Sequence, residues 1–216
     1  MMEISATKEQ GMKPVIDYTR YGARLLLLVL ALFVGACGTT PSGVPVGEGE
    51  APQAVFDEQA YGAAVELLKK KKYEESISAF EAVVRNNSSR AGPYINMGIA
   101  YRELGKYDEA KKVLLIATQA NKKSAIAFNE LGLVYRKLGE FDKAKAAYEQ
   151  SIDNSSRYGP AYRNLGILCD IYLQDFRCAI RNYERYQGLA RSEDKTVGLW
   201  IVDLKKRSGK DKGKAQ

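Results

Sequence analysis

Apolar and small residues recur along residues 57–193 with a period of 34 positions, which predicts a repeated pair of helices. Three segments share one spacing of aromatic, apolar and glycine positions: Tyr94-x-x-Met97-Gly98-x-x-Tyr101, Phe128-x-x-Leu131-Gly132-x-x-Tyr135 and Tyr162-x-x-Leu165-Gly166-x-x-Cys169. Their glycines lie 34 residues apart (132 − 98 and 166 − 132). A second series repeats at the same interval: Gly105-Lys106-Tyr107 with Ala110, and Gly139-Glu140-Phe141 with Ala144. Self-similarity at this spacing is typical of helical repeat proteins.

This pattern resembles the tetratricopeptide repeat, a 34-residue helix-turn-helix unit with conserved aromatic, Leu-Gly, Tyr and Ala positions. The resemblance implies an all-α solenoid over residues 57–193, with repeats at 57–90, 91–124, 125–158 and 159–193. The first repeat departs from the pattern, because Ala64 stands in place of the glycine. In the fourth, Ala179 falls one residue late and Cys169 replaces the tyrosine, so we expect an extra residue around 172–175.

The repeated glycines predict close helix packing and helix ends. Gly98, Gly132 and Gly166 lie among strong helix formers, where glycine costs about 1 kcal/mol relative to alanine. We expect them to let the two helices of a hairpin approach through small residues on the second helix, namely Ala110, Ala144 and Ala179. Gly105 and Gly139 follow the first helix of their repeats and suit the left-handed conformation after a helix end.

The C-terminal region predicts one more helix and a tail. Residues 194–207 form an amphipathic segment with Leu199, Trp200, Val202 and Leu204, which we interpret as a capping helix. A repeat array needs such a cap, because its last repeat cannot bury its own apolar side. Residues 208–216 are basic and low in complexity, and we expect a disordered tail that is either solvated or in contact with anionic headgroups.

The N-terminus has the pattern of an export signal. Basic residues within 12–24 precede a short apolar run from Leu25 to Val34, and Gly35-Ala36-Cys37 follows. This arrangement resembles the lipobox of bacterial lipoproteins, which implies a signal peptide over residues 1–36 and a lipid-bearing N-terminal Cys37. Residues 37–56 would be the lipidated cysteine and a flexible linker. A core cysteine at the end of a buried helix is the alternative, and translation could start at Met1 or at Met12.

Composition restricts the chemistry. The 216 residues include no histidine and three cysteines, which excludes His-dependent nucleophilic sites and His-containing zinc motifs. We therefore expect no catalytic site, no metal and no cofactor other than the covalent lipid on Cys37. Cys169 and Cys178 lie on either side of a helical turn, where they could form a disulfide or remain two buried thiols. The net charge of +7 would suit nucleic acid, but an exported protein has little access to it.

The resemblance also implies a concave groove lined by the first helix of each repeat. Apolar, arginine and asparagine side chains at these positions would suit a peptide, because Asn pairs with backbone groups and Arg holds a carboxylate. The alternative is an ordinary solvated face. The expected groove residues are Ile95, Asn96, Ile99, Arg102, Asn129, Leu133, Arg136, Arg163, Asn164 and Ile167.

These features predict a non-enzymatic scaffold or assembly factor, anchored by lipid to the bacterial envelope at the periplasmic face of the outer membrane. Its partner would be a peptide segment of an envelope protein. The chain is similar to small tetratricopeptide lipoproteins that act as type IV pilus pilotins and help a secretin assemble. The alternatives are an accessory subunit of a TonB-like or motility complex, and a structural protein that self-associates. The oligomeric state stays open.

Overall fold

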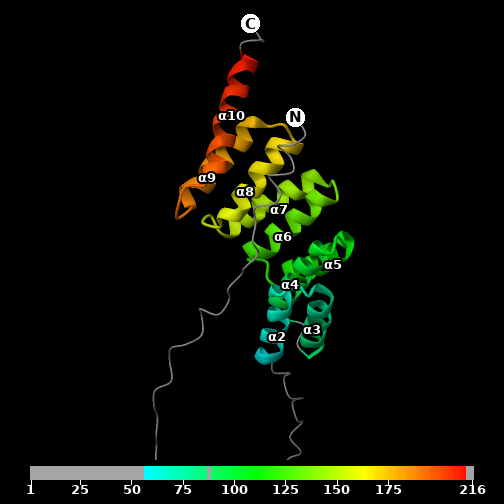
Figure 1. Cartoon of the computed structure of the whole chain (residues 1–216). Helices are drawn as coiled ribbons and strands as arrows, with labels where there is room; N and C mark the ends of the chain where they lie inside the picture. Colours follow the sequence, from blue (N-terminus) through cyan, green and yellow to red (C-terminus); the bar gives the residue numbers. More distant parts are fainter. Residues whose placement is uncertain (1–55, 87–88, 213–216) are drawn as a thin grey trace, which may run out of the picture.

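The computed structural model describes residues 56–86 and 89–212, and every regular element among them is helical. The expected all-α fold is confirmed. Figure 1 shows helices stacked in chain order, with α2 at one end and α10 at the other. Four consecutive hairpins are α2 (Glu58–Lys69) with α3 (Tyr73–Asn86), α4 (Ala91–Glu103) with α5 (Tyr107–Ala120), α6 (Ala125–Lys137) with α7 (Phe141–Asn154), and α8 (Gly159–Ile167) with α9 (Phe176–Leu189).

The first helices of successive hairpins form the inner layer of the stack. Helix α2 contacts α4, α4 contacts α6, and α6 contacts α8, in addition to the contacts within each hairpin. The second helices α3, α5 and α7 each also pack on the first helix of the next hairpin. Each repeat therefore buries apolar surface both within its own hairpin and against its neighbours, as expected of a solenoid.

The repeated glycines pack against large side chains, so the expected small-against-small contact is wrong. A Cβ added to Gly98 would lie 2.4 Å from the Leu114 side chain, and one added to Gly132 would lie 2.6 Å from the Tyr148 ring. Gly166 has the same relation to Tyr183, at 2.5 Å. The alanines expected as partners are buried nearby, but they lie one turn earlier on the second helix. Glycine thus leaves a space that a leucine or a tyrosine fills.

The turn inside each hairpin uses one left-handed residue. Gly105 and Gly139 have φ of 73° and 75°, which confirms the helix-end role expected of them. Lys71 in the first hairpin and Gln174 in the fourth occupy the same place, with φ of 60° and 52°. A side chain in this conformation costs roughly 1–2 kcal/mol relative to the right-handed one. The first and last hairpins therefore carry a backbone strain that the two middle hairpins avoid.

Lys71→Gly should relieve this strain and raise the free energy of unfolding by about 0.5–1 kcal/mol. Gly105→Ala imposes the same strain on the second hairpin and should lower it by about 1 kcal/mol. Urea unfolding followed by circular dichroism measures both values. A Lys71→Gly variant that is less stable than the wild type would show that the turn tolerates a side chain without strain.

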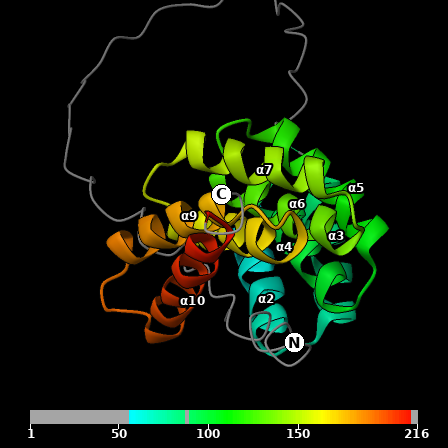
Figure 2. The same ribbon diagram turned by 90° about the horizontal axis from the view of Figure 1, so that it is seen from above.

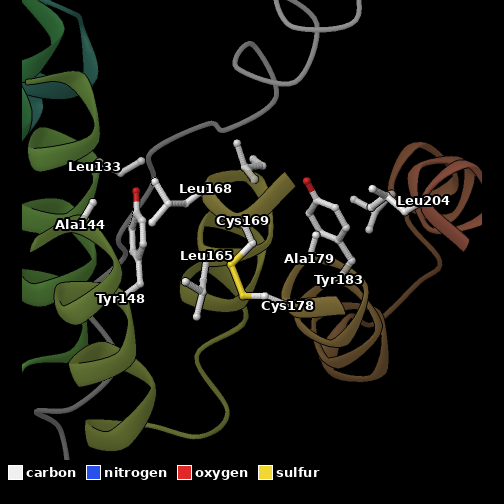
Figure 3. Close-up of a cluster of buried hydrophobic side chains, with 12 residues drawn as sticks. Leu133, Ala144, Tyr148, Leu165, Leu168, Cys169, Cys178, Ala179, Tyr183 and Leu204 are labelled. Atoms are coloured by element: carbon white, nitrogen blue, oxygen red, sulfur yellow. A yellow bond between two sulfur atoms is a disulfide. The ribbon is translucent and has the colours of Figure 1, made fainter. Parts of the chain in front are cut away.

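The fourth hairpin absorbs its extra residue in a π-helical turn. This turn, η1 (Leu168–Tyr172), extends α8 before the chain reverses at Gln174. The Cys169 carbonyl then accepts a hydrogen bond from the Asp175 amide. A disulfide joins Cys169 to Cys178 on α9, with Cα atoms 5.8 Å apart, and Figure 3 shows it inside the last hydrophobic cluster. The inserted residue anticipated around 172–175 is thus accommodated as a widened helical turn just before that point.

Helix α10 (Lys195–Lys212) closes the described array and is longer than expected. Val197 and Leu204 are buried, and the Trp200 ring lies 5.5 Å from the ring of Tyr183 on α9. Figure 2 shows α10 beside α9. The disordered tail expected from residue 208 is wrong for 208–212, which are helical. Near the expected end, Arg207 forms ion pairs with Asp203 and Asp170, and the helix continues beyond these pairs.

Cys37, the signal peptide and the linker lie outside the described residues. Within the part that the structure describes, no helix combines the length and the apolar character needed to cross a bilayer.

Candidate binding face on the inner helices

All ten residues expected to line the groove lie on the inner helices α4, α6 and α8. Side-chain amides connect these helices to one another. Asn96 on α4 donates from Nδ2 to the Tyr61 hydroxyl of α2 at 3.0 Å. Asn164 on α8 donates in the same way to the Asn129 amide oxygen of α6 at 2.8 Å. Burial raises the pKa of the Tyr61 hydroxyl, which stays protonated as the acceptor. The amides thus fix the spacing of neighbouring repeats.

Arg102 is held by two carboxylates. Its Nε lies 3.3 Å from Glu130 Oε2 on the next inner helix, and its Nη1 lies 2.7 Å from Glu103 Oε1. Burial alone lowers the pKa of this guanidinium, but the two carboxylates outweigh that effect and raise the pKa above its usual value. Arg102 is therefore neutralised inside the array, and its charge serves the contact between α4 and α6.

The aliphatic residues of the expected groove are buried. Ile95 and Ile99 belong to one hydrophobic cluster with side chains of α2, and Leu133 and Ile167 belong to another with side chains of α8 and α9. They join neighbouring repeats along the inner face. They do not form the open apolar stripe that the resemblance implied.

Arg136 repeats the position of Arg102 in the next repeat, but it has no carboxylate. The residue equivalent to Glu130 lies 28 positions after the arginine (130 − 102 and 164 − 136) and is Asn164, which carries no charge. Arg136 is only 7% exposed, and its Nε and Nη1 have no hydrogen-bond partner among the described residues. The guanidinium carbon lies 5.9 Å from the centre of the Tyr172 ring. A buried guanidinium with two unused donors is costly, so a ligand segment that displaces the side chains covering them and satisfies both donors would bind favourably.

Asn164 on α8 also has a buried side-chain atom without a partner in the part of the chain that the structure describes. The residue is fully buried, and its Oδ1 accepts no hydrogen bond from the described residues. Arg163, the preceding residue, lies over the Trp200 ring at 5.5 Å. The inner face of α6 and α8 thus combines an unused cationic donor and an unused amide acceptor with apolar neighbours. A peptide segment that carries a carboxylate has the complementary groups.

Asp170 is an inner-face residue that was not among the expected groove residues. It is buried, bonds to Arg207 Nη2 at 3.2 Å and accepts a long hydrogen bond from the Tyr183 hydroxyl at 3.5 Å. The signal was present in the sequence, because Asp170 is the residue of the fourth repeat that corresponds to Arg102 and Arg136. Because this position is acidic in the fourth repeat, it pairs with Arg207 and connects the inner face to α10.

The outer side of the array also carries a hollow of about 580 Å³ between α7 and α9. Its lining includes basic and acidic side chains in equal number: Lys145, Arg181, Arg185, Glu149, Asp153 and Asp175. Such a mixture favours no class of ligand. Across residues 56–86 and 89–212 there is also no group of histidine, cysteine, aspartate and glutamate side chains that could hold a metal ion.

Comparison with known proteins places this geometry in a known fold. Residues 89–157 match the family model described as tetratricopeptide repeat. No curated protein sequence matches the chain. Among solved structures, MamA from Desulfovibrio magneticus RS-1 (residues 41 to its end) is similar with a TM-score of 0.61 and 21% identity, covering 74% of this chain and 92% of that one.

Two further structures share the fold. PilF of Pseudomonas aeruginosa gives a TM-score of 0.63 at 14% identity and covers 70% of this chain and 68% of its own. The first tetratricopeptide domain of Spaghetti (RPAP3), solved with the HSP90 peptide SRMEEVD, gives 0.50 at 20% identity and covers 51% of this chain and 88% of its own. The described part of the chain is therefore a tetratricopeptide-type helical solenoid.

Proposed function

We propose that this chain is a non-enzymatic scaffold that binds an acidic peptide segment of a bacterial envelope protein on the inner face of α6 and α8. The observation that carries the proposal is Arg136, a buried guanidinium whose Nε and Nη1 lack a partner among the described residues. Arg102, at the equivalent position, has its own carboxylates and needs no ligand. The arginine of the second repeat is thus paired with carboxylates, whereas two nitrogens of the equivalent arginine in the third repeat have no partner among the described residues.

The envelope location rests on the sequence. The basic, apolar and Gly-Ala-Cys pattern before Cys37 favours a lipid anchor at the outer membrane, with residues 38–54 as a tether. The resemblance to pilotin-type lipoproteins and the similarity in fold to PilF favour a role in pilus or secretin assembly. The peptide seen with the RPAP3 domain, SRMEEVD, is itself acidic, which agrees with the ligand chemistry proposed for Arg136.

Two variants of the full-length chain test the binding site. Arg136→Gln removes the charge, and Asn164→Glu supplies the carboxylate that Arg102 already has. The probe is an array of synthetic 12-residue peptides, each with two Asp and two Leu in a Gly/Ser background, together with a matched set in which Lys replaces Asp. The wild type in dodecyl maltoside should prefer the acidic set. Both variants should bind it about 10-fold more weakly, as expected for a lost charged hydrogen bond.

Lys112→Gln is the matched control, because it removes one exposed positive charge from the outer helix α5. It should bind like the wild type. Asn164→Glu loses the hydrogen bond to Asn129 Oδ1 but places a carboxylate beside Arg136, so the melting temperatures of both site variants are measured to separate a blocked site from an unfolded one. Equal binding of the two peptide sets by the wild type, or unchanged binding by both site variants, would refute the proposal.

A further inference from the structure

Helix α10 repeats the register of the inner helices. The fourth repeat is 35 residues long, as the alanines show (179 − 144), and the same step from α8 leads into α10. Val202 lies 35 residues after Ile167, and Leu199 lies 35 after Asn164 (202 − 167 and 199 − 164). The two α10 residues therefore stand where the third and fourth repeats have inner-face residues. By this register α10 is the first helix of a fifth repeat whose second helix is not formed in the described chain.

Contacts between α8 and α10 support this register. Arg163 of α8 lies over the Trp200 ring at 5.5 Å, and Asp170 of η1 bonds to Arg207 Nη2 at 3.2 Å. Both Arg163 and Asp170 occupy inner-face positions of their repeat. In the same way Asn164 bonds back to Asn129 of the preceding inner helix. Helix α10 packs mainly on α9, and it reaches α8 and η1 through side chains at the positions that connect inner helices elsewhere in the array.

Leu199 and Val202 are far more exposed than any other large apolar residue that the structure describes. Leu199 is 71% exposed and Val202 66%, whereas the next two, Ile116 and Leu115 on α5, are 42% and 39% exposed. They lie one helical turn apart and project together. A helix that only caps a solenoid has a polar outer face, and this pair is not needed to cover α9, which Val197 and Leu204 already do.

We propose that Leu199 and Val202 extend the binding face onto α10 and hold two apolar side chains of the same acidic partner segment. This inference rests on the proposed function and names the segment more fully, as one that combines acidic and apolar residues. Lys195 and Lys206 lie one turn before Leu199 and one turn after Val202, and both are exposed. The apolar pair thus lies between two positive charges, and the neighbouring carboxylate of Asp203 is paired with Arg207. This arrangement suits a ligand whose leucines are bordered by carboxylates.

A second copy of the chain is a weaker choice of occupant. A stable protein–protein interface buries about 800 Å² on each partner, which two aliphatic side chains cannot supply. An extended peptide needs no such area from α10 alone, because it also contacts α6 and α8. The inner face would then run from α6 to the end of the array, the end opposite to α2 in Figure 1.

The test uses the full-length double variant Leu199→Gln/Val202→Gln. Glutamine keeps the helix and the charge, so only the apolar contact is lost. The probes are the acidic 12-residue peptides with two Leu, and a matched set in which Ser replaces Leu and the two Asp remain. The wild type should bind the Leu set at least 10-fold more tightly than the Ser set, which corresponds to about 1.4 kcal/mol. The double variant should lose this preference but still prefer Asp over Lys.

Leu115→Gln/Ile116→Gln is the matched control, with the same chemical change on the outer helix α5, and it should keep both preferences. A double variant that keeps the Leu preference would overturn the inference while leaving the proposed function intact. A wild type that retains no peptide of any set would contradict both. A concentration-dependent dimer, or binding to phosphatidylglycerol vesicles, that disappears only in Leu199→Gln/Val202→Gln would assign the pair to self-association or to the membrane and would also overturn it.

Discussion

Gly132→Ala should destabilise the wild-type array but stabilise an array that already carries Tyr148→Ala. In the wild type the added Cβ would lie 2.6 Å from the Tyr148 ring, which is fully buried between α6 and α7. Overpacking of this kind costs about 1–3 kcal/mol. Tyr148→Ala alone should lower the free energy of unfolding by about 3–5 kcal/mol, because it leaves a cavity. In that background the clash is gone, and the higher helix propensity of alanine should contribute up to about 1 kcal/mol.

Urea unfolding of the four proteins in this cycle measures the coupling between the two residues. Gly62→Ala is the matched control, because Gly62 lies inside α2 with no atom of another element within 4 Å of an added Cβ. It should raise the free energy of unfolding by about 0.5–1 kcal/mol in either background. If Gly132→Ala had the same effect with and without the Tyr148 ring, the glycine would not be there to make room for it.

Loss of the disulfide should have the second large effect. The bond between Cys169 and Cys178 closes a short loop across the η1 turn and lies in the last hydrophobic cluster. Its removal in Cys169→Ala/Cys178→Ala should lower the free energy of unfolding by about 2–4 kcal/mol. Dithiothreitol should lower the melting temperature of the oxidised wild type and leave that of the double variant unchanged, as measured by circular dichroism.

The variant Cys37→Ser serves as the control for this prediction, since it removes the one remaining cysteine of the chain and leaves the bonded pair in place. It should respond to dithiothreitol as the wild type does. An oxidised wild type whose melting temperature is insensitive to dithiothreitol, with the reduced thiols confirmed by alkylation and mass spectrometry, would show that the bond contributes little to the stability of the fourth repeat.

The periodic features of the fold could be predicted from the sequence, and the packing details could not. A step of 34 residues between Gly98, Gly132 and Gly166 predicted three hairpins, and the same spacing carried back to Ala64 predicted the first. Glycines after helix ends predicted the left-handed turns at Gly105 and Gly139. The residue that fills the space above each glycine depends on the rotation of the second helix about its own axis. That rotation places Leu114, Tyr148 and Tyr183 opposite the glycines. The rotation cannot be deduced from the alanines one turn earlier in the sequence.

The binding face shows the same division. The sequence predicted Arg102 and Arg136 as equivalent groove residues. In the structure two carboxylates neutralise Arg102, whereas two nitrogens of Arg136 have no hydrogen-bond partner among residues 56–86 and 89–212. The difference depends on one substitution, a glutamate at 130 against an asparagine at 164, and the sequence contains it. Its effect on the arginines can be inferred only from the structure, which shows that the side chains of residues 28 positions apart, such as Arg102 and Glu130, are in contact. Helix α10 was assigned as a cap because its register depends on the single inserted residue of the fourth repeat.

That inserted residue has a consequence for the length of the array. With the step of 35, Ile201 stands at the position of Gly98, Gly132 and Gly166, where the large side chain of a second helix must enter (201 − 166). An isoleucine there would collide with a side chain as large as Tyr183, so a second helix could not dock on α10 in the way that α9 docks on α8. Ile201 thus opposes the addition of another helix with this packing. Ile201→Gly would be the first substitution in engineering a longer solenoid.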